Sequence, residues 1–169
     1  TNLQFRGDGW RSSGHTVGKP SMDFLLANPA FQTYAFCSAI LALKMLFSAV
    51  YAGTRRSQYQ GFVNQEDATV FGPAGAAALP QDPPEVAHAL RIQRNDTENI
   101  PIFFAVGLLF VLTGASPWGA WFFCWTYTLA RIAHTYFYAS HMQPHRAIAF
   151  VIGSGALLLM SLRILWTTL

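Results

Sequence analysis

RIQRNDTENIPIFFAVGLLFVLTG, residues 91–114, begins with charged side chains and ends in a long apolar run. The charges belong to Arg91, Arg94, Asp96 and Glu98, and no charged residue follows them in this stretch. A membrane-spanning helix needs roughly 20 mainly apolar residues, and ionisable groups at membrane depth usually face a bundle interior or a wet cavity. The stretch therefore predicts a membrane helix with a polar site at its first end.

The composition of the whole chain also indicates a membrane protein. Of 169 residues, 52% are hydrophobic and only 11% are charged, whereas soluble domains carry about 25% charged residues. No segment alternates as a barrel strand does, so helices are the expected spanning elements. The prediction is an all-α integral membrane protein, a four-transmembrane-helix bundle with spans at about 30–51, 85–113, 118–138 and 147–166.

The first 21 residues differ from everything after them. They are polar, rich in Gly and Ser, and show no hydrophobic periodicity. We interpret residues 1–21 as an added leader or a disordered tail and leave them out of the fold prediction. Residues 22–169 are then expected to form a single membrane domain.

Charge and cysteine usage exclude several classes of function. The net charge is only +3 and no lysine-rich tract is present, so a nucleic-acid partner has no electrostatic support. Cys37 and Cys124 lie in separate apolar segments, which predicts neither a disulfide framework nor a zinc site, and we expect no metal. A haem-binding bundle needs histidines that face one another within the spans. Only His134 lies well inside a span, so we do not expect a haem-binding bundle.

Five arginines in or next to the two longer connections predict the orientation in the membrane. They lie on one side of the expected bundle, whereas the other side offers only a short GASP turn and the two termini. Because cytoplasmic loops carry an excess of Lys and Arg, this side is expected to face the cytoplasm, with both termini on the opposite side. The arginines are Arg55, Arg56, Arg91, Arg94 and Arg146.

Two of the expected spans carry a polar stripe. At 100° per residue, the polar residues of each stripe fall within an arc of about 100°. The first stripe consists of Arg91, Arg94, Asn95 and Glu98. The second repeats the same spacing at Arg131, His134, Thr135 and Tyr138. Taken alone, His134 is more typical of a hydrogen-bonded packing residue, and Tyr138 of an interface anchor.

Several charged residues within the spans need partners. Arg131 lies deep in an apolar run, so we predict a structural ion pair between Arg131 and Glu98 across two helices. Lys44 lies in the first span, where it either lines the centre of an oligomer or pairs with Asp96. Arg163 is close enough to the end of the fourth span to extend its charge to the interface.

The polar residues of the stripes suit a small zwitterion that carries surplus negative charge. Arginines bind carboxylates through two parallel hydrogen bonds, and Glu98 can hold an amine. Glutathione has this chemistry, with two carboxylates, one ammonium group and a thiol. An arginine near the thiol favours the thiolate, which is the nucleophilic form.

Four motifs of the chain resemble one known family. FVNQEDATVFG, RIQRNDTENI, RIAHTYFY and QPHRA are similar to signatures of the MAPEG family, the membrane-associated proteins in eicosanoid and glutathione metabolism. The resemblance covers about residues 36–165. Within the family, the chain looks most similar to the microsomal glutathione transferase branch. It implies a homotrimer of four-helix protomers, with a glutathione site between neighbouring protomers that opens to the cytosol.

The resemblance also implies roles for particular residues. Arg146 matches the arginine placed beside the glutathione thiol, and Asp67 matches an acid proposed for prostaglandin isomerisation, although a helix-cap or loop carboxylate is an equal interpretation of Asp67. The QPHR turn is one residue shorter than in the prostaglandin E synthase branch. The matched glutathione contacts are Arg56, Arg91, Arg94, Asn95, Glu98, His134, Tyr138 and Arg146.

Three functions remain open within this resemblance. The first is a glutathione S-transferase with peroxidase activity toward lipid hydroperoxides, acting on hydrophobic electrophiles that arrive through the bilayer. The second is a prostaglandin-E-synthase-like isomerase with glutathione as cofactor, and the third is a non-catalytic lipid-binding protein. Ala147 stands where the isomerase branch has serine, which favours the transferase, and the complete set of polar residues argues against the non-catalytic protein.

Overall fold

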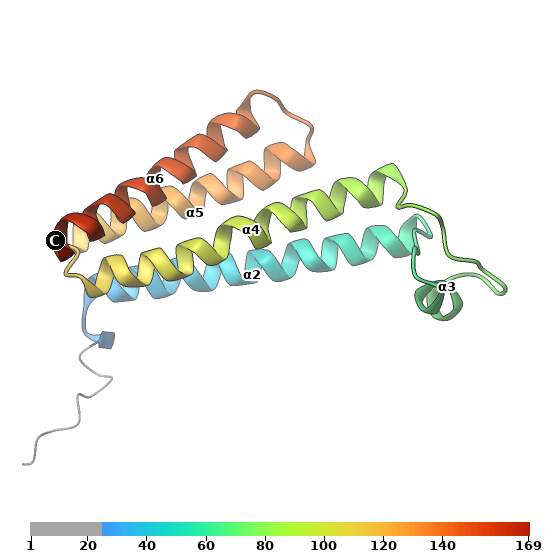
Figure 1. Ribbon diagram of the computed structural model, residues 1–169, viewed down its shortest axis with the longest axis horizontal. Helices are drawn as coiled ribbons and strands as arrows, with labels where there is room; N and C mark the ends of the chain where they lie inside the picture. The colour runs from blue at the N-terminus through green and yellow to red at the C-terminus, as the bar shows by residue number, and fades with distance from the viewer. Residues whose placement is uncertain (1–24) are drawn as a thin grey trace, which may run out of the picture.

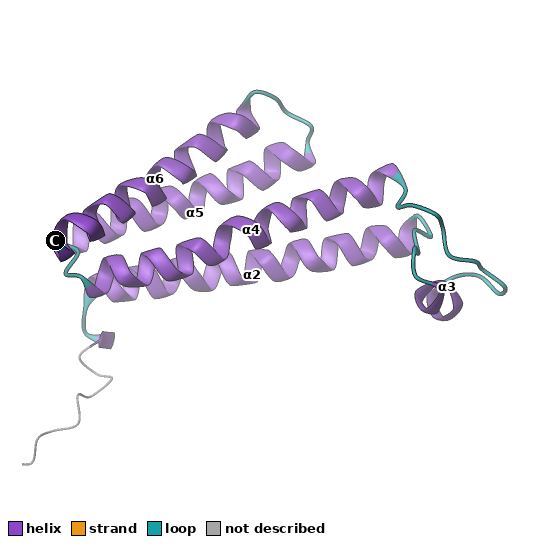
Figure 2. Cartoon of the chain, viewed as in Figure 1, coloured by secondary structure: helices purple, strands orange, loops and turns teal. Residues whose placement is uncertain are grey.

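The computed structural model describes residues 25–169, and this part of the chain consists of helices and connecting loops (Figure 2). The short helix α3 (Gln65–Phe71) lies beyond the ends of the longer helices (Figure 1). The four long helices are α2 (Pro29–Gln58), α4 (Pro84–Leu112), α5 (Pro117–Ala139) and α6 (His145–Thr168). The all-α prediction is therefore confirmed for residues 25–169, and the leader or tail predicted at residues 1–21 lies outside this part.

Proline and capping residues determine where three of the long helices begin. Pro29, Pro84 and Pro117 occupy the first turn, where the missing N–H is not needed and the fixed φ suits a helix. The Asn28 side chain accepts a hydrogen bond from the Ala30 N–H at 2.9 Å. Such caps satisfy donors that a helix N-terminus otherwise leaves free.

The long helices associate mainly as two pairs, α2 with α4 and α5 with α6, and α2 also contacts α5 (Figure 1). Between the pairs, the Phe103 and Tyr127 rings stack with centroids 4.6 Å apart. The Tyr34 hydroxyl donates to the Phe104 carbonyl at 2.8 Å, which ties α2 to α4. Gly107 permits this approach, since a Cβ atom there would lie only 3.0 Å from the Tyr34 ring.

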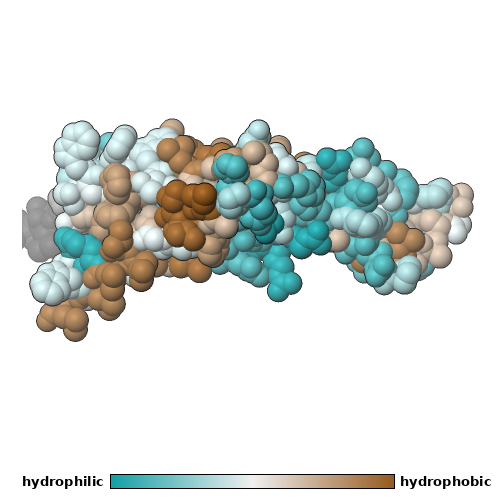
Figure 3. All heavy atoms as spheres, turned by 90° about the horizontal axis from the view of Figure 1, so that it is seen from above, coloured by the Kyte–Doolittle hydropathy of each residue, from teal (hydrophilic) through white to brown (hydrophobic). Residues whose placement is uncertain are grey.

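Large apolar side chains cover much of the outside of the helices, and they gather at the end where α6 finishes (Figure 3). Leu43, Phe47 and Leu158 are among those exposed. Within residues 25–169, three helices are long and apolar enough to cross a membrane: α2, α4 and α6. Helix α5 forms where the third span was predicted, but its crossing of the membrane stays a prediction.

The start of α2 and the end of α6 lie at one end of the molecule, and the connections around α3 and between α5 and α6 lie at the other (Figure 1). This second end holds the residues of the predicted site. Helix α2 continues to Gln58, about two turns beyond the apolar segment predicted to end at Tyr51. The difference arises because an apolar run marks membrane depth, whereas a helix can continue into water.

Candidate functional site

A cavity of about 310 Å³ lies between α4, α5 and the start of α6. Four of the predicted site residues line it, although they come from three helices and are up to 51 positions apart in the sequence. We call it the α4–α6 cavity. Its lining residues are Asn95, His134, Tyr138, Gln143, Arg146, Ala147, Phe150 and Val151.

Arg146 is held at the cavity by contacts with two neighbours. Its guanidinium carbon lies 4.3 Å from the centroid of the Tyr138 ring, which is a cation–π contact. With the Gln143 amide turned so that its oxygen faces Arg146, that oxygen accepts a hydrogen bond from Arg146 Nε at 3.1 Å. The remaining guanidinium donors can therefore serve a ligand while the side chain keeps its position.

His134 and Tyr138 form one wall of the cavity because they are four residues apart on α5. Their ring centroids are 5.8 Å apart, and Phe150 of α6 lies 6.2 Å from His134 on another side. His134 is buried, whereas Tyr138 is partly exposed. The cavity thus joins an aromatic wall to a cationic rim.

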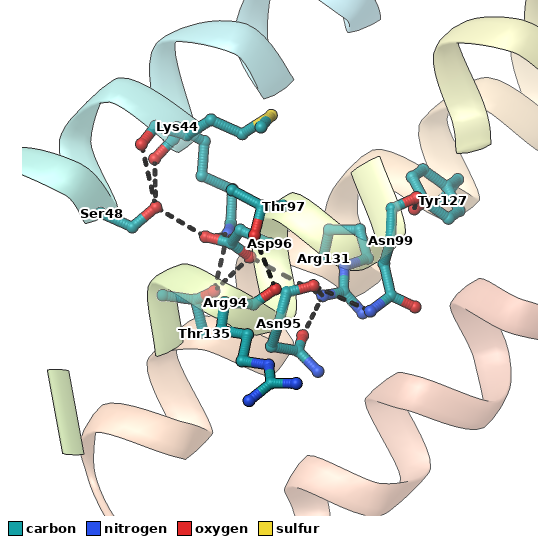
Figure 4. A network of polar contacts seen from close by, with 11 residues as sticks. Lys44, Ser48, Arg94, Asn95, Asp96, Thr97, Asn99, Tyr127, Arg131 and Thr135 are labelled. Atoms are coloured by element: carbon teal, nitrogen blue, oxygen red, sulfur yellow. Dashed lines mark hydrogen bonds and ion pairs between the residues drawn. The ribbon is translucent and has the colours of Figure 1, made fainter. Parts of the chain in front are cut away.

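Asn95 is oriented by Arg131. The Arg131 Nη2 atom donates both to the Asn95 carbonyl, at 3.4 Å, and to the side-chain oxygen of Asn95. A guanidinium has donors and no acceptor, so the oxygen of the amide must face Arg131. The amide nitrogen of Asn95 is then turned away from Arg131 (Figure 4) and is available to the α4–α6 cavity.

A buried polar network lies behind Asn95, between α2, α4 and α5 (Figure 4). Lys44 Nζ lies 2.6 Å from both carboxylate oxygens of Asp96 and 2.6 Å from the Thr135 hydroxyl. The Ser48 hydroxyl donates to Asp96 at 2.8 Å, and Arg131 Nη2 lies 3.7 Å from Asp96 Oδ1. Of the two interpretations of Lys44, pairing with Asp96 is confirmed.

The prediction of an ion pair between Arg131 and Glu98 is wrong, because the two side chains have different partners. Glu98 instead accepts a hydrogen bond from Arg94 at 2.8 Å on the outer face of α4, where the side chains are 56% and 79% exposed respectively. The side chain of Arg131 is only 2% exposed and faces Asp96. Asp96 and Glu98 are two residues apart and hence about 200° apart around the helix, so only one of them can face the interior.

The first polar stripe is therefore divided between two surroundings. Asn95 contacts Arg131 in the interior, whereas Arg91, Arg94 and Glu98 are exposed on the outside of α4. These three charged side chains do not line the α4–α6 cavity.

Arg56 and Asp67 are not among the residues that line the α4–α6 cavity. Arg56, near the end of α2, has a long ion pair with Asp82, with Nη2 and Oδ1 3.9 Å apart. Asp67 is in the first turn of α3, where its carboxylate accepts a weak hydrogen bond from the Asn64 amide at 3.4 Å. This environment agrees with the interpretation of Asp67 as a helix-end carboxylate, since negative charge is favourable at a helix N-terminus.

Comparison with known proteins identifies the family to which these residues belong. The model of the MAPEG family matches residues 34–166. The chain belongs to the MAPEG family. The resemblance noted in the four sequence motifs is thereby confirmed.

The relatives of this chain include two groups of proteins. Human prostaglandin E synthase is 31% identical over 148 residues, covering 87% of this chain and 95% of that protein. Rat prostaglandin E synthase is 36% identical over 139 residues, covering 82% and 87%. Bovine microsomal glutathione S-transferase 1 is 34% identical over 143 residues, covering 83% and 92%. The two groups match at similar identity, so identity does not choose between their activities.

Membership of the MAPEG family and the three long apolar helices make this a membrane protein. Within residues 25–169, no cluster of three or more His, Cys, Asp or Glu side chains is placed to hold a metal ion.

A second hollow of about 280 Å³ in this MAPEG protein was not expected from the sequence. It lies at the same end of the molecule, between the end of α2, the start of α4 and the end of α5. The His88 and His141 rings stack there with centroids 4.3 Å apart, and His88 is 5.3 Å from the Tyr138 ring. Both histidines lie near the ends of their apolar segments, and nothing in the sequence indicates that they meet.

Proposed function

We propose that this protein is a membrane-bound glutathione S-transferase with peroxidase activity. Glutathione is the co-substrate, and the second substrates are hydrophobic electrophiles and lipid hydroperoxides that reach the site through the bilayer. The observation that carries the proposal is the position of Arg146, which contacts Tyr138 and Gln143 at the α4–α6 cavity that Asn95 also lines.

The lining of the cavity suits an anion. Arg146, the Asn95 amide nitrogen and the Tyr138 hydroxyl can all donate hydrogen bonds, and the lining residues include no carboxylate. A guanidinium beside a thiol favours the thiolate, because opposite charges in close contact stabilise the ionised form. The cavity is thus suited to the thiol end of glutathione.

The carboxylates and the ammonium group of glutathione need further partners. Arg91, Arg94 and Glu98 carry suitable charges but are exposed on the outer side of α4. Arg56, at the end of α2, is likewise outside the α4–α6 cavity. We propose that these residues meet a glutathione molecule at the contact between neighbouring protomers of a homotrimer.

In the transferase reaction the glutathione thiolate attacks the electrophilic carbon of the second substrate, a carbon–sulfur bond forms, and the leaving group departs with the electron pair. In the peroxidase reaction two glutathione molecules are oxidised to the disulfide, and one hydroperoxide is reduced to an alcohol and water. Arg146 has the same part in both, since each begins with a thiolate.

A glutathione-dependent isomerase is the second candidate, supported by the similarity to prostaglandin E synthases. In this chain Ala147 lines the α4–α6 cavity, so the position after Arg146 provides no hydroxyl group. Asp67 lies on α3 and does not line the cavity. Both observations favour the transferase. The non-catalytic lipid-binding alternative does not account for a positioned Arg146.

We further propose that all four long helices cross the membrane and that the end bearing the α4–α6 cavity faces the cytoplasm. The end in question carries five arginines on α2, α4 and α6, which suits the cytoplasmic side. They are Arg55, Arg56, Arg91, Arg94 and Arg146.

The test is glutathione-dependent turnover of the detergent-purified protein on three substrates: an aryl halide, a lipid hydroperoxide and a prostaglandin endoperoxide. Conjugation of the aryl halide and reduction of the hydroperoxide are expected to exceed isomerisation. Rapid isomerisation without net loss of glutathione identifies the second candidate, and glutathione binding without turnover of any of the three identifies the non-catalytic one.

A further inference from the structure

The buried network behind Asn95 contains charged groups whose ionisation follows from their contacts. Lys44 Nζ lies within hydrogen-bond distance of three acceptor atoms, two on Asp96 and one on Thr135, which uses all three protons of an ammonium group. Asp96 accepts from both Lys44 and Ser48, as an ionised carboxylate does. Lys44 and Asp96 therefore neutralise each other.

Arg131 is a second cation in the same network. Its side chain is 2% exposed, and a guanidinium stays protonated in proteins. Asp96, which Lys44 already contacts at 2.6 Å, is 3.7 Å from Arg131. Among residues 25–169, Asp96 is the single buried acidic residue, so the network of Lys44, Asp96 and Arg131 carries one surplus positive charge.

The surplus charge is connected to the α4–α6 cavity through Asn95. Arg131 Nη2 holds the carbonyl and the side-chain oxygen of Asn95, and this fixes the Asn95 amide as a donor toward the cavity. Arg131 Nε has no hydrogen-bond partner within the described residues. The hydrogen bonds of the Arg131 side chain to a neutral residue are therefore those from Nη2 to Asn95. A buried charge is screened less by solvent than an exposed one.

We propose that Lys44, Asp96 and Arg131 are positioning residues whose surplus positive charge, acting through Asn95, favours the thiolate form of glutathione in the α4–α6 cavity. The inference rests on the proposed function. Lys44 of α2 and Asp96 in the interior of α4 would then influence the ionisation of the thiol, although neither residue lines the cavity.

Other groups also face the cavity and must be kept constant in a test. They are His134 and Tyr138 from α5 and Arg146 from α6, whereas α4 contributes the neutral Asn95. The exposed pair of Arg94 and Glu98 is on the outer side of α4 and is itself neutral. None of these groups is changed by substitutions at Lys44 or Asp96.

Three variants separate charge from packing. Lys44→Gln keeps an amide donor beside Asp96 but leaves the network neutral. Asp96→Asn keeps an acceptor for Lys44 and raises the network charge to two. The double variant pairs Gln with Asn and restores a single positive charge on Arg131. The probe is glutathione, and the readout is the ultraviolet absorbance of its bound thiolate against pH.

The network charge predicts an order for the pKa of the bound thiol. A unit charge about 10 Å away, at an effective dielectric constant of about 20, shifts a pKa by about one unit. Lys44→Gln is expected to raise the pKa of the bound thiol by up to this amount and Asp96→Asn to lower it. The double variant is expected to return the pKa to the wild-type value.

The outcomes separate this inference from the proposed function. If the wild-type protein does not bind glutathione, the proposed function fails. If it binds, but the double variant follows Lys44→Gln, or all variants titrate as the wild type does, the surplus charge has no effect on the thiol and the inference is overturned. If the network is purely structural, all three variants should have lower melting temperatures. The bound thiol should then titrate in each variant as it does in the wild type. If Asp96→Asn alone does not fold, the comparison of Lys44→Gln with the double variant still decides.

Discussion

Replacing Arg146 by alanine tests the centre of the proposed mechanism. A guanidinium about 4 Å from a thiolate contributes roughly 1 kcal/mol in bulk water and roughly 4 kcal/mol at an effective dielectric constant of 20. The partly exposed Arg146 lies between these limits, at the edge of the α4–α6 cavity. Since one pKa unit corresponds to about 1.4 kcal/mol, Arg146 is expected to lower the pKa of the bound thiol by about one to three units from its usual value near 8.5.

The expected loss of turnover follows from the fraction of thiolate. At pH 7, a thiol with a pKa of 8.5 is about 3% ionised, and one with a pKa of 7.5 is about 24% ionised. Arg146→Ala should therefore reduce turnover at pH 7 by about tenfold or more, with a smaller loss of glutathione affinity. The reduction should shrink as the pH rises above 8.5, because the thiol then ionises without help.

The assay combines thiolate absorbance of the bound ligand with turnover across the same pH range. Arg146→Lys is the matched control, since it keeps the charge but lacks the guanidinium group that contacts the Tyr138 ring at 4.3 Å. Arg91→Ala, on the exposed face of α4, should weaken affinity more than it slows the chemical step. If Arg146→Ala retains the wild-type titration and turnover, the thiol is activated elsewhere and the reasoning is refuted.

Three further substitutions test other parts of the protein. Glu98→Gln should weaken glutathione binding measured by calorimetry while changing the free energy of unfolding by less than about 1 kcal/mol, because its pair with Arg94 is exposed; unchanged affinity would contradict its part in binding. Asp67→Ala should leave transferase turnover nearly intact, and a loss of turnover at unchanged affinity would instead indicate proton transfer by Asp67. Gly107→Ala should lower the melting temperature by overpacking against Tyr34, at a cost of about 1–3 kcal/mol, and an unchanged melting temperature would mean that the ring can move aside.

The positions of the long helices could be predicted from the sequence because apolar runs and prolines mark them. The span expected at 118–138 is α5, Pro117–Ala139, and that expected at 85–113 is α4, Pro84–Leu112. The short helix α3 was missed, since seven residues in a polar connection show no useful periodicity. Of the residues that line the α4–α6 cavity from α5 and α6, the sequence motifs predicted His134, Tyr138 and Arg146 but not Phe150 and Val151.

The partner of Arg131 could not be predicted because hydrophobicity does not distinguish the inside from the outside of a membrane helix. In α4 apolar side chains face both the interior and the surroundings, and two acids two residues apart offer opposite choices. Asp96 faces the interior because Lys44 and Ser48 of α2 meet it there. That contact depends on how α2 packs against α4, which no local pattern records.

Helices α2 and α6 are longer than the hydrocarbon core of a bilayer is thick, and this has a consequence for how substrate concentration should be expressed. Helix α2 has 30 residues and α6 has 24, which correspond to about 45 Å and about 36 Å at 1.5 Å per residue. A hydrocarbon core about 30 Å thick leaves several residues at the arginine-bearing end in the headgroup layer. In the proposed transferase reaction, a water-soluble thiol and a lipid-dissolved electrophile would meet at that level from two different phases. The rate should therefore follow the mole fraction of electrophile in the bilayer, so that adding inert lipid at constant total substrate slows the reaction by surface dilution.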